Sequence, residues 1–137
     1  MVFIDSNVWL YLLLAQQSLA KSSIAHALIQ NNRQNIAISS QVVIEVAGNL
    51  LRKGNFSEPQ IAKFIADAYK DYSVVDVSEK IMIRASKLRG KYSLSYFDSL
   101  IVSAALETNC TTLYSEDMHD GLVVENTLTI MNPFTSS

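Results

Sequence analysis

The sequence predicts an α/β fold, in which a largely parallel central sheet carries helices on both of its faces. Short segments that are apolar, or that alternate between apolar and polar residues, recur along the chain. Between them lie longer segments with helical spacing and a capping residue at the start. Strands that alternate with helices in this way are typical of a parallel sheet. No repeat, low-complexity stretch or linker interrupts the pattern, so we expect one domain over residues 1–137.

The first half of the chain opens on a strand. Val2-Phe3-Ile4 is apolar throughout, and Ser6 or Asn7 can cap a helix that runs to Leu14. The next elements are a helix over Leu19–Asn31, an alternating strand over Asn35–Ser39, and a helix that begins at a Ser40 cap and reaches Lys53. Gly54 follows that helix at the C′ position, where glycine is common.

A capping box opens the second half. Ser57 and Gln60 have the spacing of reciprocal caps, with Pro59 in the first turn, and we expect their helix to reach about Tyr72. The remaining elements are a strand over Ser73–Val77, a helix from Ser78 to Gly90, a helix from Ser95 to near Asn109, a strand over Thr111–Ser115, and short strands over Leu122–Val124 and Leu128–Met131.

Composition indicates a globular protein that needs no covalent or metal support. Apolar residues make up 49% of the 137 residues and charged residues 18%. A chain of this length buries roughly two-thirds of its unfolded surface. The single cysteine, Cys110, excludes an internal disulfide and a cysteine-cluster zinc site. We expect it to be buried and inert.

The chain has no segment that we expect to enter a membrane. The apolar run Val8–Leu14 is shorter than the ~20 residues that a spanning helix needs. Asp5 interrupts any apolar signal region, and no basic segment precedes it. We therefore expect a soluble, cytoplasmic protein. The net charge is −2, and all eleven lysines and arginines lie between Lys21 and Lys91.

Four acidic residues stand where the predicted strands end. Asp5 directly follows the first strand, and Glu45 lies in the opening turns of the helix after the second. Asp98 is in the first turn of the helix that leads to the Thr111–Ser115 strand, and Asp117 lies just beyond that strand. Because ligands bind at the carboxyl ends of parallel strands, we expect these four side chains to meet at one edge of the sheet.

Each of these acids also has a simpler interpretation. Asp5 fits a helix N-cap, and Asp98 fits the third position of a capping box that begins at Ser95. Asp117 fits a turn. Glu45 fits a solvated helix face less well, since its neighbours are apolar and a carboxylate there needs a partner.

Taken together, the four acids favour a metal site. Carboxylates that lie close to one another repel and need a compensating cation. Hard oxygen ligands without a cysteine cluster favour Mg²⁺ or Mn²⁺ over zinc. The matching chemistry is metal-assisted hydrolysis of a phosphodiester bond.

Other polar residues give weaker signals. His26 fits a helix face and His119 a loop, and no glycine-rich phosphate loop is present. A basic run precedes the Asp98 helix and fits either cations at a helix C-terminus or a patch that contacts the phosphates of a nucleic acid. It consists of Arg84, Lys87, Arg89 and Lys91.

Four segments of the chain resemble the PIN-domain nucleases, and among them the VapC-type toxins of toxin–antitoxin pairs. They read FIDSNVWLYLL, ISSQVVIEVAGNLLRKG, SLSYFDSLIVSAALETNCTTLYSED and LTIMNPF, and they extend nearly from end to end. The resemblance implies a metal-dependent endoribonuclease in which Asp5, Glu45, Asp98 and Asp117 bind Mg²⁺ or Mn²⁺ and activate water to cleave RNA.

The resemblance also implies supporting residues and partners. Ser115 corresponds to a hydroxyl that supports the fourth acid, while Ser6 and Asn7 are expected to orient the site and Glu116 to assist it. The family further implies a homodimer and a cognate antitoxin that covers the active site, often with a helix in an apolar groove. The first helix, Trp9 to Leu14, suits either such a surface or the core.

Two departures from the family's pattern and one rival function stay open, and a second rival is disfavoured. Met118-His119-Asp120 replaces the aromatic residue that often follows the family's fourth acid, and Glu116 or Asp120 can share or displace the role of Asp117. A non-catalytic PIN-like module that binds a metal or a basic partner would carry the same acids. A receiver-like regulatory domain is disfavoured, since Asp5 stands alone and no lysine follows Lys91.

Overall fold

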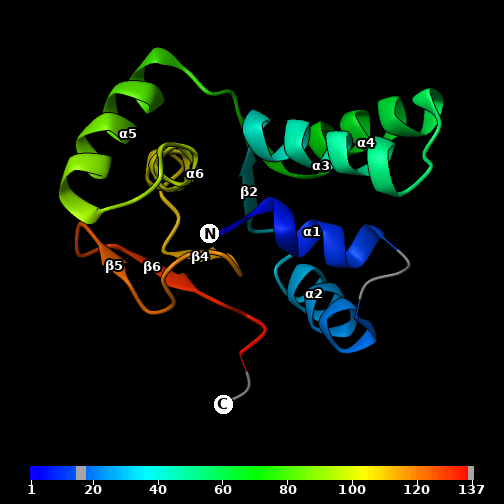
Figure 1. The fold of residues 1–137 in the computed structure, drawn as a ribbon, viewed down its shortest axis with the longest axis horizontal. Coiled ribbons are helices and arrows are strands. Elements are labelled where there is room, and N and C mark those ends of the chain that lie inside the picture. The colour runs from blue at the N-terminus through cyan, green and yellow to red at the C-terminus, as the bar shows by residue number, and fades with distance from the viewer. Residues whose placement is uncertain (15–17, 136–137) are drawn as a thin grey trace.

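A computed structural model describes residues 1–14 and 18–135 of the chain. Helices and strands alternate along it as the sequence predicts (Figure 1). In chain order these elements are β1 (Val2–Ile4), α1 (Ser6–Leu13), α2 (Leu19–Asn31), β2 (Ile36–Ser39), α3 (Ser40–Lys53), α4 (Glu58–Asp71), β3 (Ser73–Val75), α5 (Glu79–Tyr92), α6 (Tyr96–Glu107), β4 (Thr112–Tyr114), β5 (Val123–Val124) and β6 (Leu128–Met131).

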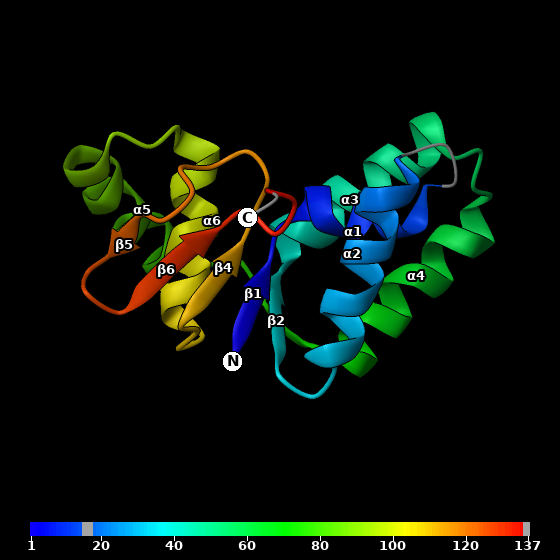
Figure 2. The ribbon, with the colours of Figure 1, turned by 90° about the horizontal axis from the view of Figure 1, so that it is seen from below.

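The strands form a six-stranded sheet in the order β3-β2-β1-β4-β6-β5 (Figure 2). All neighbouring strands are parallel except β5 and β6, which form an antiparallel pair at one edge. Val2 of β1 stands opposite Ile36 on one side and Thr112 on the other. The predicted α/β fold with a largely parallel sheet is therefore confirmed.

The order of the strands explains where the helices lie. From β1 the chain adds β2 and β3 on one side, and it then crosses to β4 on the other side of β1. Right-handed crossovers in opposite directions put α1–α4 on one face of the sheet and α5–α6 on the other (Figure 1). The direction reverses between β1 and β4, which is the place where ligands bind in sheets of this kind.

The strands at this reversal point are buried on both faces. Phe3, Ile4 and Leu113 have no exposed surface. Trp9 of α1 packs beneath them and donates from its indole Nε1 to the carbonyl of Ile4 at 3.1 Å. The first residues of the chain thus form a rigid base for whatever follows β1.

Two helix starts differ from the prediction by one residue. Asp5, and not Ser6 or Asn7, is the N-cap of α1, because its carboxylate accepts from the Ser6 N–H at 2.7 Å; this is the simpler interpretation of Asp5 given above. Ser39, and not Ser40, caps α3. The Ser40 hydroxyl is engaged elsewhere, since it accepts from the Val77 N–H at 3.0 Å.

Element ends also differ where the backbone turns left-handed. The helix predicted to stop at Gly90 runs on to Tyr92, and Ser93 then ends it with a φ of 54°. Gly54 is the C-cap of α3 with a φ of −100°, and Asn55 is the residue that adopts the left-handed conformation. The Ser57 capping box is present as predicted.

Candidate functional site

Asp5 lies at the carboxyl end of β1 with only 6% of its surface exposed. The Ser6 N–H donates to its Oδ1 at 2.7 Å, and the buried Ser115 hydroxyl donates to its Oδ2 at 2.8 Å. Ser115 follows β4, the neighbouring strand, so both sides of the reversal point hold this carboxylate. Each oxygen also has a longer contact at 3.5 Å, Oδ1 with the Ser6 hydroxyl and Oδ2 with the Asn7 Nδ2.

Glu45 approaches Asp5 from α3. The Ser6 hydroxyl donates to Glu45 Oε2 at 2.8 Å, and the Gln41 amide donates to Oε1 at 2.9 Å. Ser6 therefore contacts both acids, because its backbone donates to Asp5 and its side chain donates to Glu45. Glu45 is half-buried, as the apolar sequence around it suggests.

Asp98 reaches the same region from the first turn of α6. Its backbone N–H donates to the hydroxyl of the N-cap Ser95 at 3.1 Å, so the predicted cap is present. Gln41 joins this turn to α3, because its amide Nε2 also donates to the carbonyl of Phe97 at 3.3 Å. The start of α6 is thereby tied to the Glu45 side chain.

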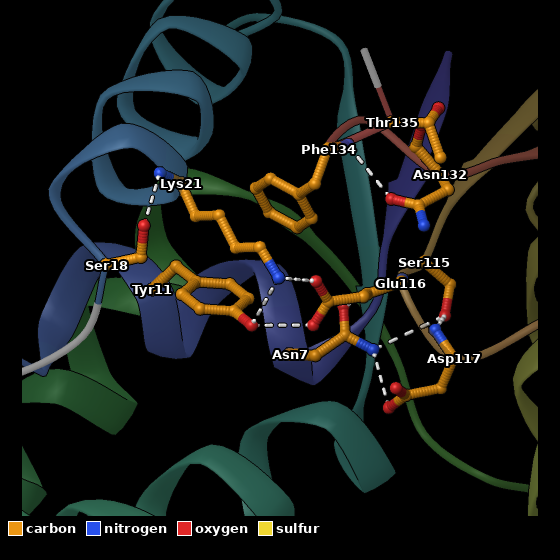
Figure 3. Close-up of polar contacts among 10 residues, drawn as sticks. All are labelled: Asn7, Tyr11, Ser18, Lys21, Ser115, Glu116, Asp117, Asn132, Phe134 and Thr135. Carbon is orange, nitrogen blue, oxygen red and sulfur yellow. Dashed lines mark hydrogen bonds and ion pairs between the residues drawn. The ribbon is translucent and has the colours of Figure 1, made fainter.

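Asp117 is exposed and is held by Asn7 of α1 (Figure 3). The Asn7 Nδ2 donates to Asp117 Oδ2 at 3.1 Å and to the Ser115 hydroxyl at 3.4 Å. The Asn7 Oδ1 accepts from the Glu116 N–H at 3.2 Å, which fixes the orientation of the amide. The Asp117 N–H donates in turn to the Ser115 hydroxyl at 3.3 Å.

The charges of these acids act on one another. Burial raises the pKa of Asp5 to about 6, the bonds from Ser115 and Ser6 oppose the rise, and the nearby carboxylates of Glu45 and Asp98 add to it. Burial also raises the pKa of Asp98, and the charges of Asp117 and Glu45 raise it further. In the described part of the chain, no lysine or arginine forms an ion pair with any of these four acids.

The four carboxylates fit a divalent cation in their donor chemistry and charge. Their oxygens are hard ligands, and their mutual repulsion has no cation of the protein to balance it. Across residues 1–14 and 18–135, however, no three acidic, histidine or cysteine side chains stand close enough to hold a metal ion as they are placed. The acids therefore form a linked cluster around Asp5 that is wider than a closed metal cage.

Two acids that were considered as substitutes for Asp117 are engaged elsewhere. Glu116 turns away from the cluster and pairs with Lys21 (Figure 3). Asp120 accepts from the Asn132 N–H at 2.9 Å. His26 and His119 are exposed, and Met118 packs into the core in place of the family's aromatic residue. Asp117 stays our candidate for the fourth position.

The basic run extends from the middle of α5 to its C-terminal end. Arg84 is paired with Glu107 at the end of α6 and with Glu125 in the hairpin. Glu107 and Asp98 are nine residues apart on α6, about 13 Å along its axis, so Arg84 lies far from the acid cluster. Lys87, Arg89 and Lys91 are exposed, and Lys91 is nearest in sequence to the start of α6.

Sequence reasoning missed three residues of this region. Gln41 could have been found, because it lies four residues before Glu45 and therefore on the same side of α3. Lys21 and Tyr11 gave no signal, since their partner Glu116 lies 95 and 105 residues away in the chain.

Comparison with protein-family models matches residues 2–119 to the PIN domain. No curated protein matches the sequence.

Several solved structures share the fold. A toxin–antitoxin complex from Klebsiella pneumoniae contains a chain with a TM-score of 0.73 and 18% identity, matched over 98% of both chains. VapC20 of Mycobacterium tuberculosis, described as a sarcin–ricin loop cleaving toxin, has a TM-score of 0.68 and 15% identity over 82% of this chain and 87% of that one. The DNA-bound VapBC of Salmonella typhimurium contains a chain with a TM-score of 0.69 and 11% identity, matched over 96% of this chain and 97% of that one. At these identities the likeness concerns the fold.

Proposed function

This chain belongs to the PIN domain family, and we propose that it is a metal-dependent endoribonuclease, the toxin of a type II toxin–antitoxin pair. The observation that carries the proposal is the cluster of Asp5, Glu45, Asp98 and Asp117 at the point where the strand order reverses. The charges of these four acids, which come from separate segments, affect one another there. Among the described residues, no lysine or arginine forms an ion pair with them. Such a site suits a divalent metal and a phosphate ligand.

The four acids are the proposed ligands of Mg²⁺ or Mn²⁺. A bound ion of this kind supplies an activated water and neutralises the charge that develops on the phosphoryl oxygens. Asp5 is the fixed member, since it is buried and held through both oxygens. Glu45, Asp98 and Asp117 are more exposed than Asp5.

Hydroxyl and amide groups orient these acids. Ser6 donates to Glu45, and Ser115 donates to Asp5. Asn7 holds Asp117 through its amide. We assign these three residues a positioning role, because each donates a hydrogen bond to one of the proposed ligands and leaves other lone pairs of that carboxylate free.

RNA is the proposed substrate. One neighbour of the same fold is described as cleaving the sarcin–ricin loop, which supports RNA over DNA. We propose that Lys87, Arg89 and Lys91 contact phosphates of the bound strand, since they are exposed on α5. Arg84 is the weakest member of this predicted patch, because two acids already pair with it.

The proposed partners are an antitoxin and a second copy of the chain. One neighbour is described as a toxin–antitoxin complex, and two others are VapBC assemblies bound to DNA, which supports the first. A groove of about 370 Å³ between α1 and α4 gives an apolar helix of the antitoxin a place to bind; its lining includes Trp9, Leu12, Leu13, Phe56, Phe64 and Tyr72.

No helix within the described residues has the length and apolar character to cross a membrane. We propose a cytoplasmic homodimer.

Amide variants of the acids test the assignment. Glu45→Gln, Asp98→Asn and Asp117→Asn each keep the shape of the side chain and remove its charge, so each is expected to lower RNA cleavage at least tenfold, on the order of the loss expected for an altered metal site. Asp120→Asn is the matched control, since the Asp120 carboxylate accepts from the backbone N–H of Asn132 and is not among the four proposed ligands. Equal cleavage by Asp117→Asn and Asp120→Asn would remove Asp117 from the site.

The second candidate is a PIN-like module that binds without cleaving. The wide spacing of the carboxylates favours it, because no three of them converge in the described residues. Mn²⁺ binding without any cleavage of RNA by folded, antitoxin-free protein would support this reading over the nuclease.

A further inference from the structure

Glu116 lies between Ser115 and Asp117, yet its side chain points away from the acid cluster (Figure 3). Its carboxylate is held from α1 and α2. The Tyr11 hydroxyl donates to Oε1 at 2.7 Å, and the Lys21 Nζ donates to Oε2. The same Nζ also donates to the Tyr11 oxygen at 3.3 Å, so the three side chains close a ring of contacts.

The aromatic rings of Tyr11 and Phe134 lie beside the Lys21–Glu116 pair. Phe134 packs edge-on against Tyr11, with the ring centroids 4.8 Å apart. The Lys21 Nζ lies 5.1 Å from the centroid of Tyr11 and 5.7 Å from that of Phe134. The Glu116 side chain is 21% exposed and the Lys21 side chain 38%. Charge pairs that are partly withdrawn from water are screened less by salt than pairs on the open surface.

The backbone of Glu116 carries this restraint into the candidate site. Its N–H donates to the Asn7 Oδ1, which leaves the Asn7 Nδ2 facing Asp117 and Ser115. If the Glu116 segment shifts, the Asn7 Oδ1 loses its donor, and the amide is then held only by the longer contacts of its Nδ2 with Ser115 at 3.4 Å and Asp5 at 3.5 Å. Asp117 then loses the donor that holds its Oδ2.

We propose that Lys21 and Tyr11 are positioning residues of the nuclease site, which act through Glu116 on Asn7 and Asp117. The inference rests on the proposed function for its activity readout, and on the structure for its metal-binding readout. Lys21 has a second effect in this arrangement, because its charge balances a carboxylate next to Asp117. Without Lys21, Glu116 would add an unpaired negative charge beside the cluster.

A different role for Lys21 would be direct contact with an RNA phosphate. The two roles predict different kinetics. The loss of a phosphate contact weakens RNA binding and reduces the salt dependence of that binding, and so it raises KM. A positioning residue alters the placement of Asp117 whether or not RNA is present, and so lowers kcat and the affinity for metal.

The test is Lys21→Met, with cleavage of a labelled RNA by the full chain and calorimetric titration of RNA-free protein with Mn²⁺. We expect kcat and Mn²⁺ affinity each to fall by about tenfold to a hundredfold, the range known for residues that orient metal ligands. Lys63→Met is the matched control, since it breaks the exposed pair with Asp67 on α4, away from the site. Circular dichroism confirms that each variant is folded.

A double variant separates the pathways. Lys21→Met with Glu116→Gln removes both charges and keeps a side chain that can accept from Tyr11, so we expect it to recover part of the lost activity and affinity. Lys21→Arg keeps the charge and is expected to retain most of both.

Three results would overturn the inference: unchanged kcat and Mn²⁺ affinity in Lys21→Met, a loss confined to KM, or a double variant no better than the single one. If wild type cleaves no RNA, the proposed function fails. The Mn²⁺ titrations alone then decide whether Lys21 positions the acids.

Discussion

Replacing Asp5 with asparagine is expected to stabilise the metal-free protein while it removes activity. Asp5 is 6% exposed, and its pKa rises from 3.8 to about 6, chiefly because burial disfavours its charge. At neutral pH the folded protein must therefore hold a carboxylate whose charge its surroundings oppose. Asparagine keeps the shape and the acceptor for the Ser6 N–H, and it has no charge to bury.

The direction in which the free energy of unfolding changes with pH follows from proton binding by Asp5. Between pH 4 and 6 the folded state holds the Asp5 proton that the unfolded state has released, so the free energy of unfolding falls as pH rises through this window. The interval from 3.8 to about 6 corresponds to about 3 kcal/mol in full. Between pH 4.5 and pH 7.5 the part that is measured is about 2 kcal/mol.

Urea denaturation in EDTA at these two pH values measures the effect. Wild type is expected to lose about 2 kcal/mol relative to Asp5→Asn between pH 4.5 and pH 7.5. Any pH-independent effect of the amide cancels in this comparison. Asp71→Asn, at an exposed position, should follow wild type within about 0.5 kcal/mol. A gap between wild type and Asp5→Asn that stays constant with pH would refute the argument.

Three further substitutions test the framework that holds the site, each by urea denaturation at pH 7.5. Gly48→Ala in α3 should raise stability by about 0.5–1 kcal/mol, because the added Cβ meets no atom within 4 Å; a loss would mean that this face is occupied. Leu113→Ala in the fully buried centre of β4 should cost about 3 kcal/mol, and a cost below about 1 kcal/mol would contradict the packing. Glu107→Gln should cost about 1 kcal/mol, because it breaks pairs with Lys80 and Arg84. Bonds from these two residues lower the pKa of Glu107, so this cost should shrink below pH 4.5, and a cost that grows there would contradict the pairing.

The sequence predicts the parts of the site that follow from strand ends. An apolar strand that leads into Asp5 places this residue at the edge of a parallel sheet. The supporting role of Ser115 is implied only by the family resemblance. Glu45 is placed by its position in the opening turns of the helix that follows the second strand. These placements depend on the local order of apolar and polar residues, which a single sequence is enough to show.

The parts that it could not predict depend on contacts between distant segments. Nothing near Lys21 indicates that Glu116 will be its partner, and nothing near Arg84 indicates Glu107 or Glu125. The cap of α3 was misplaced by one residue because two serines compete there, and the choice depends on Val77, which takes the second hydroxyl. Tertiary contacts decide between local options that are nearly equal.

The most direct test of the central claim is cleavage of a labelled, structured RNA by antitoxin-free protein in Mg²⁺, in Mn²⁺ and in EDTA, with Asp5→Asn beside wild type. Circular dichroism establishes that both are folded. We expect cleavage by wild type with either metal, and none in EDTA or with Asp5→Asn. Cleavage that persists in EDTA, or that Asp5→Asn retains in full, would contradict a carboxylate–metal nuclease centred on Asp5.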